Sequence, residues 1–280
     1  MSDEARWIAG IDSSTPNLAR MHDYFIGGKD NFAVDREAAE AVLATAPEVR
    51  VMAQEHQAFQ GRVIPFLVEQ GITQFITLGS GLPSEANTHE LARSLAPDAR
   101  VAYVDNDPVV LAHARAILAR GAGTGVVKGD ILHPAELLAD PDLRAVIDLD
   151  QPVAVLLLGV LQYIPDGHEP FRHVAELRDA LPAGSHIVIT HVVFDSRPEV
   201  AEPIVALYRR MLGHAEGGAR TRETVLPFFD GLELVEPGLV YVREWRPDSP
   251  FQSERPEKAW VMVGVGRKAG PPPLEPVIGR

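Results

Sequence analysis

A short segment, QFITLGSGLP (74–83), constrains the fold of this chain more than any other. Its first part, Phe75–Leu78, is apolar and rich in the residue types of buried strands, and a Gly-Ser-Gly turn follows at 79–81. Glycines can adopt positive φ angles and let a ligand approach the bare backbone. A strand that enters such a turn ahead of a helix can form a ligand-binding corner, but an ordinary strand-to-helix connection has the same pattern.

Strands and helices alternate beyond this turn. We predict strands at Phe75–Leu78, Val101–Val104, Val126–Lys128, Val153–Leu158 and His186–His191. Helices are predicted at 84–96, 107–120, 171–180, 198–212 and 221–229. Two more strands, Leu239–Glu244 and Lys258–Val265, follow one another without a helix between them. This order favours an α/β fold with a mostly parallel sheet and one antiparallel strand at or near its edge.

The first 70 residues precede the sheet and have a helical pattern. Thr15-Pro16 is predicted to cap a helix that Gly27-Gly28 ends, and helices over 35–46 and 49–70 follow. The loop GGKDNF (27–32) suits either a surface turn or a lid that offers hydrogen bonds to a ligand. We therefore divide the chain into a helical cap segment (1–70), a sheet domain (71–268) and a proline-rich tail (269–280) that is not expected to fold.

Composition excludes several classes of function. The net charge is −13, without the basic stripe of phosphate-backbone binders, so we expect no nucleic-acid partner. The chain has no cysteine, which excludes disulfides, thiolate metal sites and cysteine nucleophiles. The longest apolar run, Val153–Leu161, is too short to span a bilayer, and the acidic N-terminal segment lacks the apolar region of a signal peptide. We expect a soluble, cytoplasmic protein, and the sequence is silent on its oligomeric state.

Glycine or acidic residues follow three consecutive predicted strands: the turn at 79–81, Asp105 and Asp130. Ligands of open α/β sheets bind beyond the carboxyl ends of the strands, so these positions face one crevice. A carboxylate after the second strand can accept hydrogen bonds from both hydroxyls of a ribose, and an acid after the third can accept from an adenine amino group. Helix capping is the alternative role for the acids at 105 and 107, and we expect Asp107 to be a cap in either case.

The glycine turn departs from the dinucleotide-binding fingerprint. Gly-x-Gly-x-x-Gly requires a third glycine at position 84, which is Ser84, and Pro83 stiffens the turn before it. A pyrophosphate needs close approach to a helix N-terminus. The sequence therefore favours an adenosyl ligand without phosphates, and an NAD-dependent oxidoreductase is the less favoured alternative.

Several segments carry a family resemblance. TLGSGLP (77–83), RVAYVDNDPVVLAHARAIL (100–118) and GD (129–130) resemble class I S-adenosylmethionine-dependent methyltransferases. More narrowly, ARMHDYFIGGKDNFAVDREAAEAVL (19–43) together with VDNDP (104–108) resembles the S-adenosyl methyltransferase family of actinobacterial proteins, first catalogued as a domain of unknown function. The resemblance spans residues 12–266. It implies a Rossmann-like sheet of seven strands, mostly parallel with one antiparallel, under an N-terminal helical cap, with S-adenosyl-L-methionine as the cofactor.

The resemblance also implies which residues hold that cofactor. They are Gly79, Ser80, Gly81, Asp105, Asn106, Asp130, Ile131, Gly159 and Leu161, with Tyr24, Lys29 and Asn31 from the cap. The turn at 79–81 would hold the methionine side, Asp105 the ribose, Asp130-Ile131 the adenine, and the residues after the fourth strand the methionyl and acceptor side. Two positions depart from the family pattern: Thr77 replaces an acid, and His56-Gln57 replaces an Asn-Arg pair.

Catalytic residues do not stand out, because methyl transfer from a sulfonium depends on in-line positioning and desolvation more than on acid–base help. Tyr163, His168 and His191 near the strand ends, and His22 and Tyr24 in the cap, are candidates, although packing or surface roles suit each of them. The ten histidines lack ligand-like spacing, so we expect no metal. We infer methyl transfer from S-adenosylmethionine to an unidentified small-molecule acceptor, with a non-catalytic S-adenosylmethionine-binding protein as the alternative.

Overall fold

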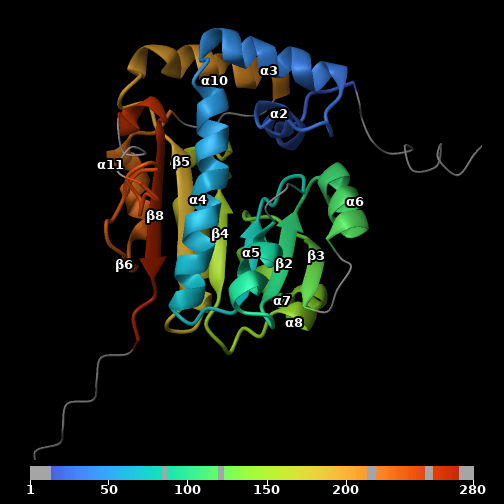
Figure 1. The fold of residues 1–280 in the computed structure, drawn as a ribbon, viewed down its shortest axis with the longest axis vertical. Helices are drawn as coiled ribbons and strands as arrows, with labels where there is room; N and C mark the ends of the chain where they lie inside the picture. Colours follow the sequence, from blue (N-terminus) through green and yellow to red (C-terminus); the bar gives the residue numbers. More distant parts are fainter. Residues whose placement is uncertain (1–13, 84–86, 119–122, 213–218, 250–254, 271–280) are drawn as a thin grey trace, which may run out of the picture.

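A single twisted sheet lies at the centre of the molecule (Figure 1). The structure is a computed structural model that describes residues 14–83, 87–118, 123–212, 219–249 and 255–270. Within these residues eight strands form the order β3-β2-β1-β4-β5-β8-β6, and β7 also pairs with β8. The strands are β1 (Gln74–Leu78), β2 (Arg100–Asp105), β3 (Thr124–Lys128), β4 (Ala154–Leu158), β5 (His186–Val192), β6 (Glu233–Leu234), β7 (Val240–Tyr241) and β8 (Val261–Arg267).

The strand directions follow the predicted pattern. β1 to β5 are parallel, whereas β8 is antiparallel to β5, with Thr190 opposite Val263. The first five predicted strands are confirmed to within two residues of their bounds. The strand predicted at Leu239–Glu244 is only Val240–Tyr241, and β6 is absent from the prediction because two residues show no alternation. The seven-strand arrangement is therefore formed, with β6 and β7 sharing its last edge.

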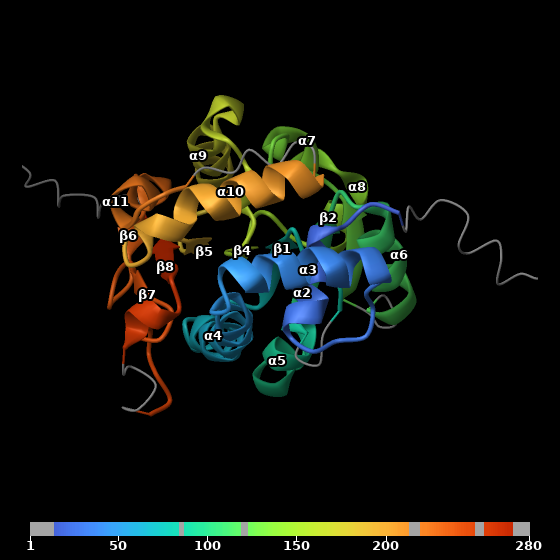
Figure 2. The same ribbon diagram turned by 90° about the horizontal axis from the view of Figure 1, so that it is seen from above.

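Helices cover both faces of the sheet (Figure 2). α4 (Val49–Glu69), α5 (Thr88–Leu95) and α6 (Pro108–Ile117) cover one face, and α7 (Pro134–Ala139), α8 (Pro141–Val146), α9 (Pro170–Ala180) and α11 (Arg222–Val225) cover the other. The 3-10 turns are η1 (Leu161–Tyr163), η2 (Asp166–His168), η3 (Leu226–Phe229) and η5 (Pro256–Lys258). α7 and α8 are absent from the sequence prediction, although α8 has a start signal in its Asp140 cap and Pro141.

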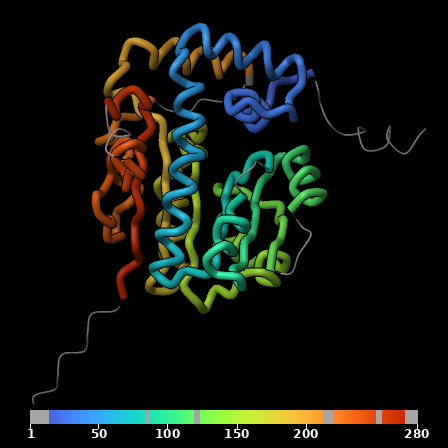
Figure 3. The backbone as a smooth tube through the Cα atoms, in the orientation of Figure 1, coloured from blue at the N-terminus to red at the C-terminus, as the bar shows by residue number. Residues whose placement is uncertain are grey.

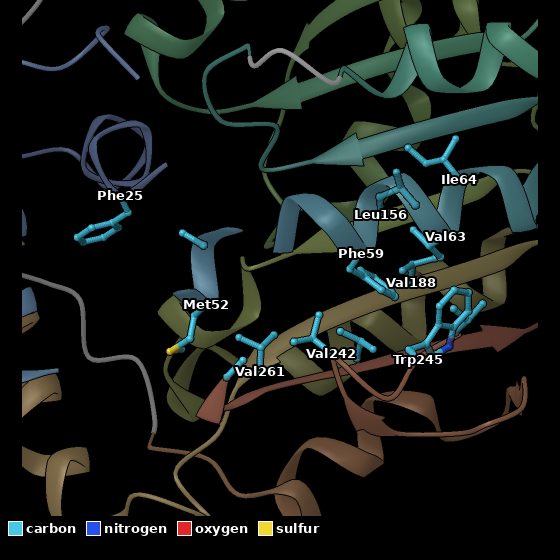
Figure 4. Packing of buried hydrophobic residues seen from close by; sticks show 14 of the residues in the cluster. Phe25, Met52, Phe59, Val63, Ile64, Leu156, Val188, Val242, Trp245 and Val261 are labelled. Atoms are coloured by element: carbon cyan, nitrogen blue, oxygen red, sulfur yellow. The ribbon is translucent and has the colours of Figure 1, made fainter. Parts of the chain in front are cut away.

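Alternate side chains of the strands enter two separate cores. In β1, Phe75 packs in the core beneath α4, whereas Ile76 packs in the core beneath α7 to α9. Phe59 of α4 is fully buried in the first core, and its ring meets the ring of Trp245 edge to face at 5.2 Å (Figure 4). α4 is thus anchored along the sheet, while its first turns reach past the strand ends toward α2 (Leu18–Phe25) and α3 (Ala33–Thr45) (Figure 1).

Three helices lie across the carboxyl ends of the parallel strands: α2 (Leu18–Phe25), α3 (Ala33–Thr45) and α10 (Pro198–Leu212) (Figure 3). The side chain of Asn17 caps α2 by accepting a hydrogen bond from the backbone of Arg20, so the predicted cap at Thr15 is wrong by two residues. A buried ion pair between Arg20 and Asp35, 2.7 Å apart, joins α2 to α3. These contacts fix α2 and α3, which we call the cap from here on, to each other, and the two helices lie over the edge where ligands of such sheets bind.

Some expectations fall outside the described part of the chain. Residues 1–13 and 271–280 are not described, so the expectation that the tail does not fold stays a prediction. Among the described residues, no helix combines the length and the apolar character needed to cross a membrane.

Candidate active site

The two glycines after β1 have different reasons to be glycine. Both have positive φ, +66° at Gly79 and +64° at Gly81. A Cβ on Gly79 would lie 2.5 Å from a methyl carbon of Val160, so the turn after β1 packs directly against the turn after β4. A Cβ on Gly81 would meet nothing within 4 Å. Gly81 therefore leaves bare backbone beside open space, which suits close approach by a ligand.

Asp105 ends β2 beside this turn and is buried. Its Oδ2 accepts a hydrogen bond from the backbone of Gly81 at 3.1 Å, and its Oδ1 accepts one from the backbone of Asp107 at 3.0 Å. Burial raises the pKa of this carboxyl, while the backbone donors oppose the rise. Each oxygen keeps acceptor capacity, so the carboxylate can still receive two hydroxyls. Asp107 caps α6, as predicted, by accepting from the backbone of Val109.

The predicted adenine side is assembled from β2 and β3. The side-chain amide of Asn106 donates to Asp130 Oδ2 at 2.9 Å, and the backbone of Leu132 donates to Asp130 Oδ1 at 2.9 Å. Ile131 is buried in the core beneath α7. The sheet thus brings together the predicted residues at the ends of β1, β2 and β3 along one edge.

The turn after β4 continues that edge. Gly159 has φ +71°, and a Cβ there would lie 2.9 Å from Cε1 of His56. The imidazole of His56, which comes from α4, therefore lies directly against the Gly159 backbone. Leu161 is fully buried, and its carbonyl accepts a hydrogen bond from Arg220 at 2.8 Å.

The three predicted cap residues make contacts of their own. The Tyr24 hydroxyl bonds to Glu40 of α3, the Asn31 amide donates to Asp23 at 2.7 Å, and Lys29 is exposed. Within the described part of the chain, none of the three bonds to the residues at the strand ends. Their contact with the cofactor stays a prediction that depends on the loop at 27–32.

A cavity of about 120 Å³ lies between the cap and the sheet. We call it the cap pocket, and its lining is Leu18, Met21, His22 and Phe25 of α2, Val49, Met52, Ala53 and His56 of α4, Gln162 and Tyr163 of η1, Val192 and Phe194 at the end of β5, Ile204, Val205 and Tyr208 of α10, and Trp260 and Val261. Figure 4 shows Phe25, Met52 and Val261 at the cap end of the core beneath α4. Because His56 also lies against Gly159, the pocket adjoins the edge described above.

Two histidines face the cap pocket in their neutral form. Burial lowers the pKa of His56 to about 3 and that of His22 to about 4. Nε2 of His56 lies 3.1 Å from the Thr190 hydroxyl, and the two imidazoles meet edge to face with ring centroids 6.1 Å apart. From the sequence, His22 is only a candidate and His56 only a departure from the family pattern. Their shared pocket cannot be predicted, because η1, β5 and α10 lie far from both residues along the chain.

The other candidates have different surroundings. Tyr163 lines the cap pocket, where its ring meets Tyr208 edge to face at 5.8 Å. His191 is buried behind η1, with Nε2 accepting a hydrogen bond from Arg220 at 2.9 Å. His168 lies in a surface groove between α7 and α9. The described residues contain no cluster of three His, Asp or Glu side chains that could hold a metal ion.

Thr77, one of the two departures from the family pattern, is buried on the α5 face of β1. Its hydroxyl lies 3.4 Å from the hydroxyl of Thr88, which accepts a hydrogen bond from Gln60 of α4 at 2.9 Å. Thr77 thus belongs to a polar contact between the strand and the two helices that cover it.

The fold and this edge define the class. The sheet is mostly parallel with one antiparallel strand, and at its carboxyl edge a glycine turn follows β1, an acid ends β2 and an acid follows β3. These are the features of a class I S-adenosylmethionine-dependent methyltransferase.

Comparison with known proteins gives the family. The sequence profile described as S-adenosyl methyltransferase matches residues 4–269. A candidate methyltransferase from Thermobifida fusca YX is 42% identical with a TM-score of 0.87, over 93% of this chain and 98% of that chain. A DUF574 family protein from Streptomyces avermitilis MA-4680 is 35% identical with a TM-score of 0.87, over 92% and 99%. None of the curated proteins compared matches the chain. The chain belongs to the S-adenosyl methyltransferase family.

S-adenosyl-L-methionine is therefore the cofactor, and the residues at the strand ends fit it. Gly81 presents backbone beside open space, and the Asp105 carboxylate has acceptor capacity for a ribose diol. The third glycine of a dinucleotide site is missing, as noted for Ser84. The family match favours methyl transfer over the oxidoreductase alternative.

Proposed function

We propose that this methyltransferase transfers a methyl group to a small molecule that binds in the cap pocket. The observation that carries the proposal is the position of His56, which lines the pocket and also lies against Gly159 at the cofactor edge. A pocket enclosed by α2, α4 and α10 suits a small ligand better than a polymer. The net charge of −13 argues against DNA or RNA as the acceptor.

In this proposal, different residues bind the cofactor and the acceptor. S-adenosylmethionine, when bound, supplies an electrophilic methyl group on a positively charged sulfur. Asp105 accepts the ribose hydroxyls, the turn at 79–81 holds the methionine side, and Asp130 with Asn106 bounds the adenine. Gly159 and Leu161 line the methionyl side where the cofactor meets the cap pocket, and the cap pocket fixes the acceptor and excludes water. Positioning and desolvation of this kind supply most of what methyl transfer needs.

The cap residues Tyr24, Lys29 and Asn31 complete the proposed cofactor site from above. The absence of cysteine supports the cytoplasm as the proposed compartment.

The test compares small and large acceptors directly. The protein is incubated with S-adenosylmethionine labelled in its methyl group and with a Streptomyces avermitilis extract divided into small molecules, nucleic acids and proteins. We expect label in the small-molecule fraction, and at least about tenfold less when Asp105→Ala replaces the wild type at the same low concentration of S-adenosylmethionine. Label in nucleic acid or protein would contradict the proposal, whereas binding of S-adenosylmethionine without labelling of any fraction would favour a non-catalytic binding protein.

A further inference from the structure

The lining of the cap pocket is aromatic and carries no ionised side chain. Phe25, Tyr163, Phe194, Tyr208 and Trp260 contribute rings from five different elements or turns of the chain. Among the described lining residues there is no Asp, Glu, Lys or Arg. Aromatic side chains pair favourably with another ring in offset or edge-to-face geometry. A cavity near 150 Å³ is known to hold benzene, so about 120 Å³ suits a single ring.

Two histidines of this lining have ring nitrogens without a hydrogen-bond partner among the described residues. Nε2 of His56 is engaged with Thr190, but Nδ1 of His56 has no hydrogen-bond partner among the described residues. The ring nitrogens of His22 have none either within that part of the chain, although its ring lies 6.1 Å from that of His56. A neutral imidazole offers one donor and one acceptor, and leaving them unpaired in an apolar surrounding is costly. A ligand with one hydroxyl would satisfy such an atom.

We propose that the cap pocket takes an uncharged phenol, whose hydroxyl donates a hydrogen bond to Nδ1 of His56 and is the site of methylation. The inference rests on the proposed function, because it assumes that the cap pocket is the acceptor site. Nδ1 of His56 is the ring nitrogen nearest the turn after β4, 3.5 Å from where a Cβ of Gly159 would lie. A hydroxyl bound to it is therefore placed beside the proposed methionyl side of the cofactor.

The transfer step balances with these groups alone. The phenolic oxygen forms a bond to the methyl carbon, the carbon–sulfur bond breaks and leaves its electron pair on sulfur, and the phenolic proton passes to Nδ1 of His56. Burial that keeps His56 a weak base does not prevent this step, because the oxygen becomes strongly acidic only as its bond to carbon forms. The phenol stays neutral until then, as an apolar pocket requires.

The first experiment measures selectivity with matched single-ring probes. Phenol, toluene, benzoate and benzylammonium are titrated by calorimetry into wild-type protein saturated with S-adenosylhomocysteine at neutral pH. We expect phenol to bind at least about tenfold more tightly than either ion, because burying an unpaired charge costs more than one hydrogen bond returns. Phenol should also bind about fivefold more tightly than toluene, the value of one hydrogen bond. Benzoate or benzylammonium binding as tightly as phenol, or no binding of any probe, would overturn the inference.

The second experiment locates the site. Ala53→Phe adds a ring inside the pocket, and Ala58→Phe, on an exposed position of the same helix, is its matched control. Ala53→Phe should abolish phenol binding while Ala58→Phe retains it, and S-adenosylhomocysteine binding by both variants shows that they are folded. His56→Leu should remove the preference for phenol over toluene. Unchanged phenol binding in Ala53→Phe, or an unchanged preference in His56→Leu, would refute the assignment.

The two proposals fail in different ways. If S-adenosylhomocysteine binds and an ionic probe occupies the cap pocket, a small-molecule acceptor stands and the phenol is wrong. If label from the methyl group appears only in macromolecules, the proposed function itself is wrong, whatever the probes do.

Discussion

Close contact between the turns after β1 and β4 restricts which residues fit at the carboxyl ends of the strands. The family resemblance assigns Gly159 to the cofactor, and the structure adds a second reason for glycine there, because Cε1 of His56 lies 2.9 Å from where its Cβ would be. Gly79 is likewise required by Val160, whereas Gly81 faces open space. A glycine in such a turn can thus be required by close packing or can leave room for a ligand. The sequence pattern is the same in both cases, and only the fold shows which of the two applies.

In the proposed site, Asp105 is the residue on which we expect cofactor binding to depend most. Removing it by Asp105→Ala deletes the acceptor for the ribose and frees the Gly81 backbone that it holds. Hydrogen bonds to charged groups contribute about 1.5–3 kcal/mol, so S-adenosylhomocysteine affinity should fall about ten- to a hundredfold by calorimetry. Asp107→Ala should instead lower the free energy of unfolding by about 1 kcal/mol through loss of the α6 cap. Equal losses of affinity in the two variants would show that the ribose acceptor is misassigned.

Among the elements, η1 matters most, because it borders both the proposed cofactor site and the cap pocket. Arg220, which is buried, donates to the carbonyls of Leu161 and Ile164, each at 2.8 Å, and to Asp166 at 2.6 Å. Its guanidinium also lies 5.4 Å from the centre of the Phe228 ring. One planar side chain thus fixes both ends of the turn that carries Tyr163.

Replacing Arg220 by lysine should loosen this turn. A lysine has no planar fork to reach two carbonyls, so at least one buried carbonyl loses its partner, at about 1–3 kcal/mol each. We expect Arg220→Lys to lower the free energy of unfolding in urea by about 2 kcal/mol or more and to raise the dissociation constant of S-adenosylhomocysteine. Arg222→Lys, at an exposed neighbour, should change neither. Stability equal to the wild type in Arg220→Lys would refute the role.

One contact between α2 and the sheet lies beside Asp105, the proposed ribose acceptor. The side-chain amide of Asn17 donates to Asp107 Oδ2 at 2.5 Å, while Asn17 Oδ1 caps α2. Binding of S-adenosylhomocysteine should slow hydrogen exchange in residues 20–32 if the cap closes on the cofactor. Asn17→Asp keeps the cap of α2 but sets a carboxylate against Asp107, so exchange there should be faster with and without ligand. Exchange unaffected by saturating ligand would contradict closure.

The sequence predicted elements whose pattern is local and long enough to repeat. Apolar runs predict β1 to β5, and the pair Asp107-Pro108 predicts the start of α6. β6, at two residues, has no period to detect, and the start of α2 moved because Asn17, not Thr15, provides the cap. The strand-end residues could be named because each follows its own strand. The cap pocket could not, since it joins α2, α4, η1 and α10 only after the chain has folded.

Four histidines are held in their neutral form, His186 and His191 buried and His22 and His56 half-buried at the cap pocket, which makes the stability of the molecule sensitive to acid. Burial lowers the pKa of His22 and His186 to about 4 and of His56 and His191 to about 3. The unfolded chain binds protons near pH 6.5, so the stabilisation is complete above that pH and is lost as the pH falls toward the folded values. Asp23 and Asp105, whose pKa values are raised by burial, oppose this trend at lower pH.

Urea unfolding of the ligand-free protein at pH 7 and pH 5 tests this sensitivity. Each histidine contributes a slope of up to about 1.4 kcal/mol per pH unit, so the free energy of unfolding should fall steeply between the two values. His186→Gln should reduce the dependence of the free energy of unfolding on pH by up to about 1.4 kcal/mol per pH unit, the contribution of one histidine. A free energy of unfolding that is constant across this range would show that these histidines are not held neutral.

We infer that one continuous edge of the sheet holds the cofactor beside the cap pocket. This arrangement can be tested by a crystal structure of the protein with S-adenosylhomocysteine. We expect both ribose hydroxyls within hydrogen-bond distance of the Asp105 carboxylate, and the sulfur directed past Gly159 toward His56 and the cap pocket. A ribose held by other residues, or a sulfur directed away from the cap pocket, would contradict it.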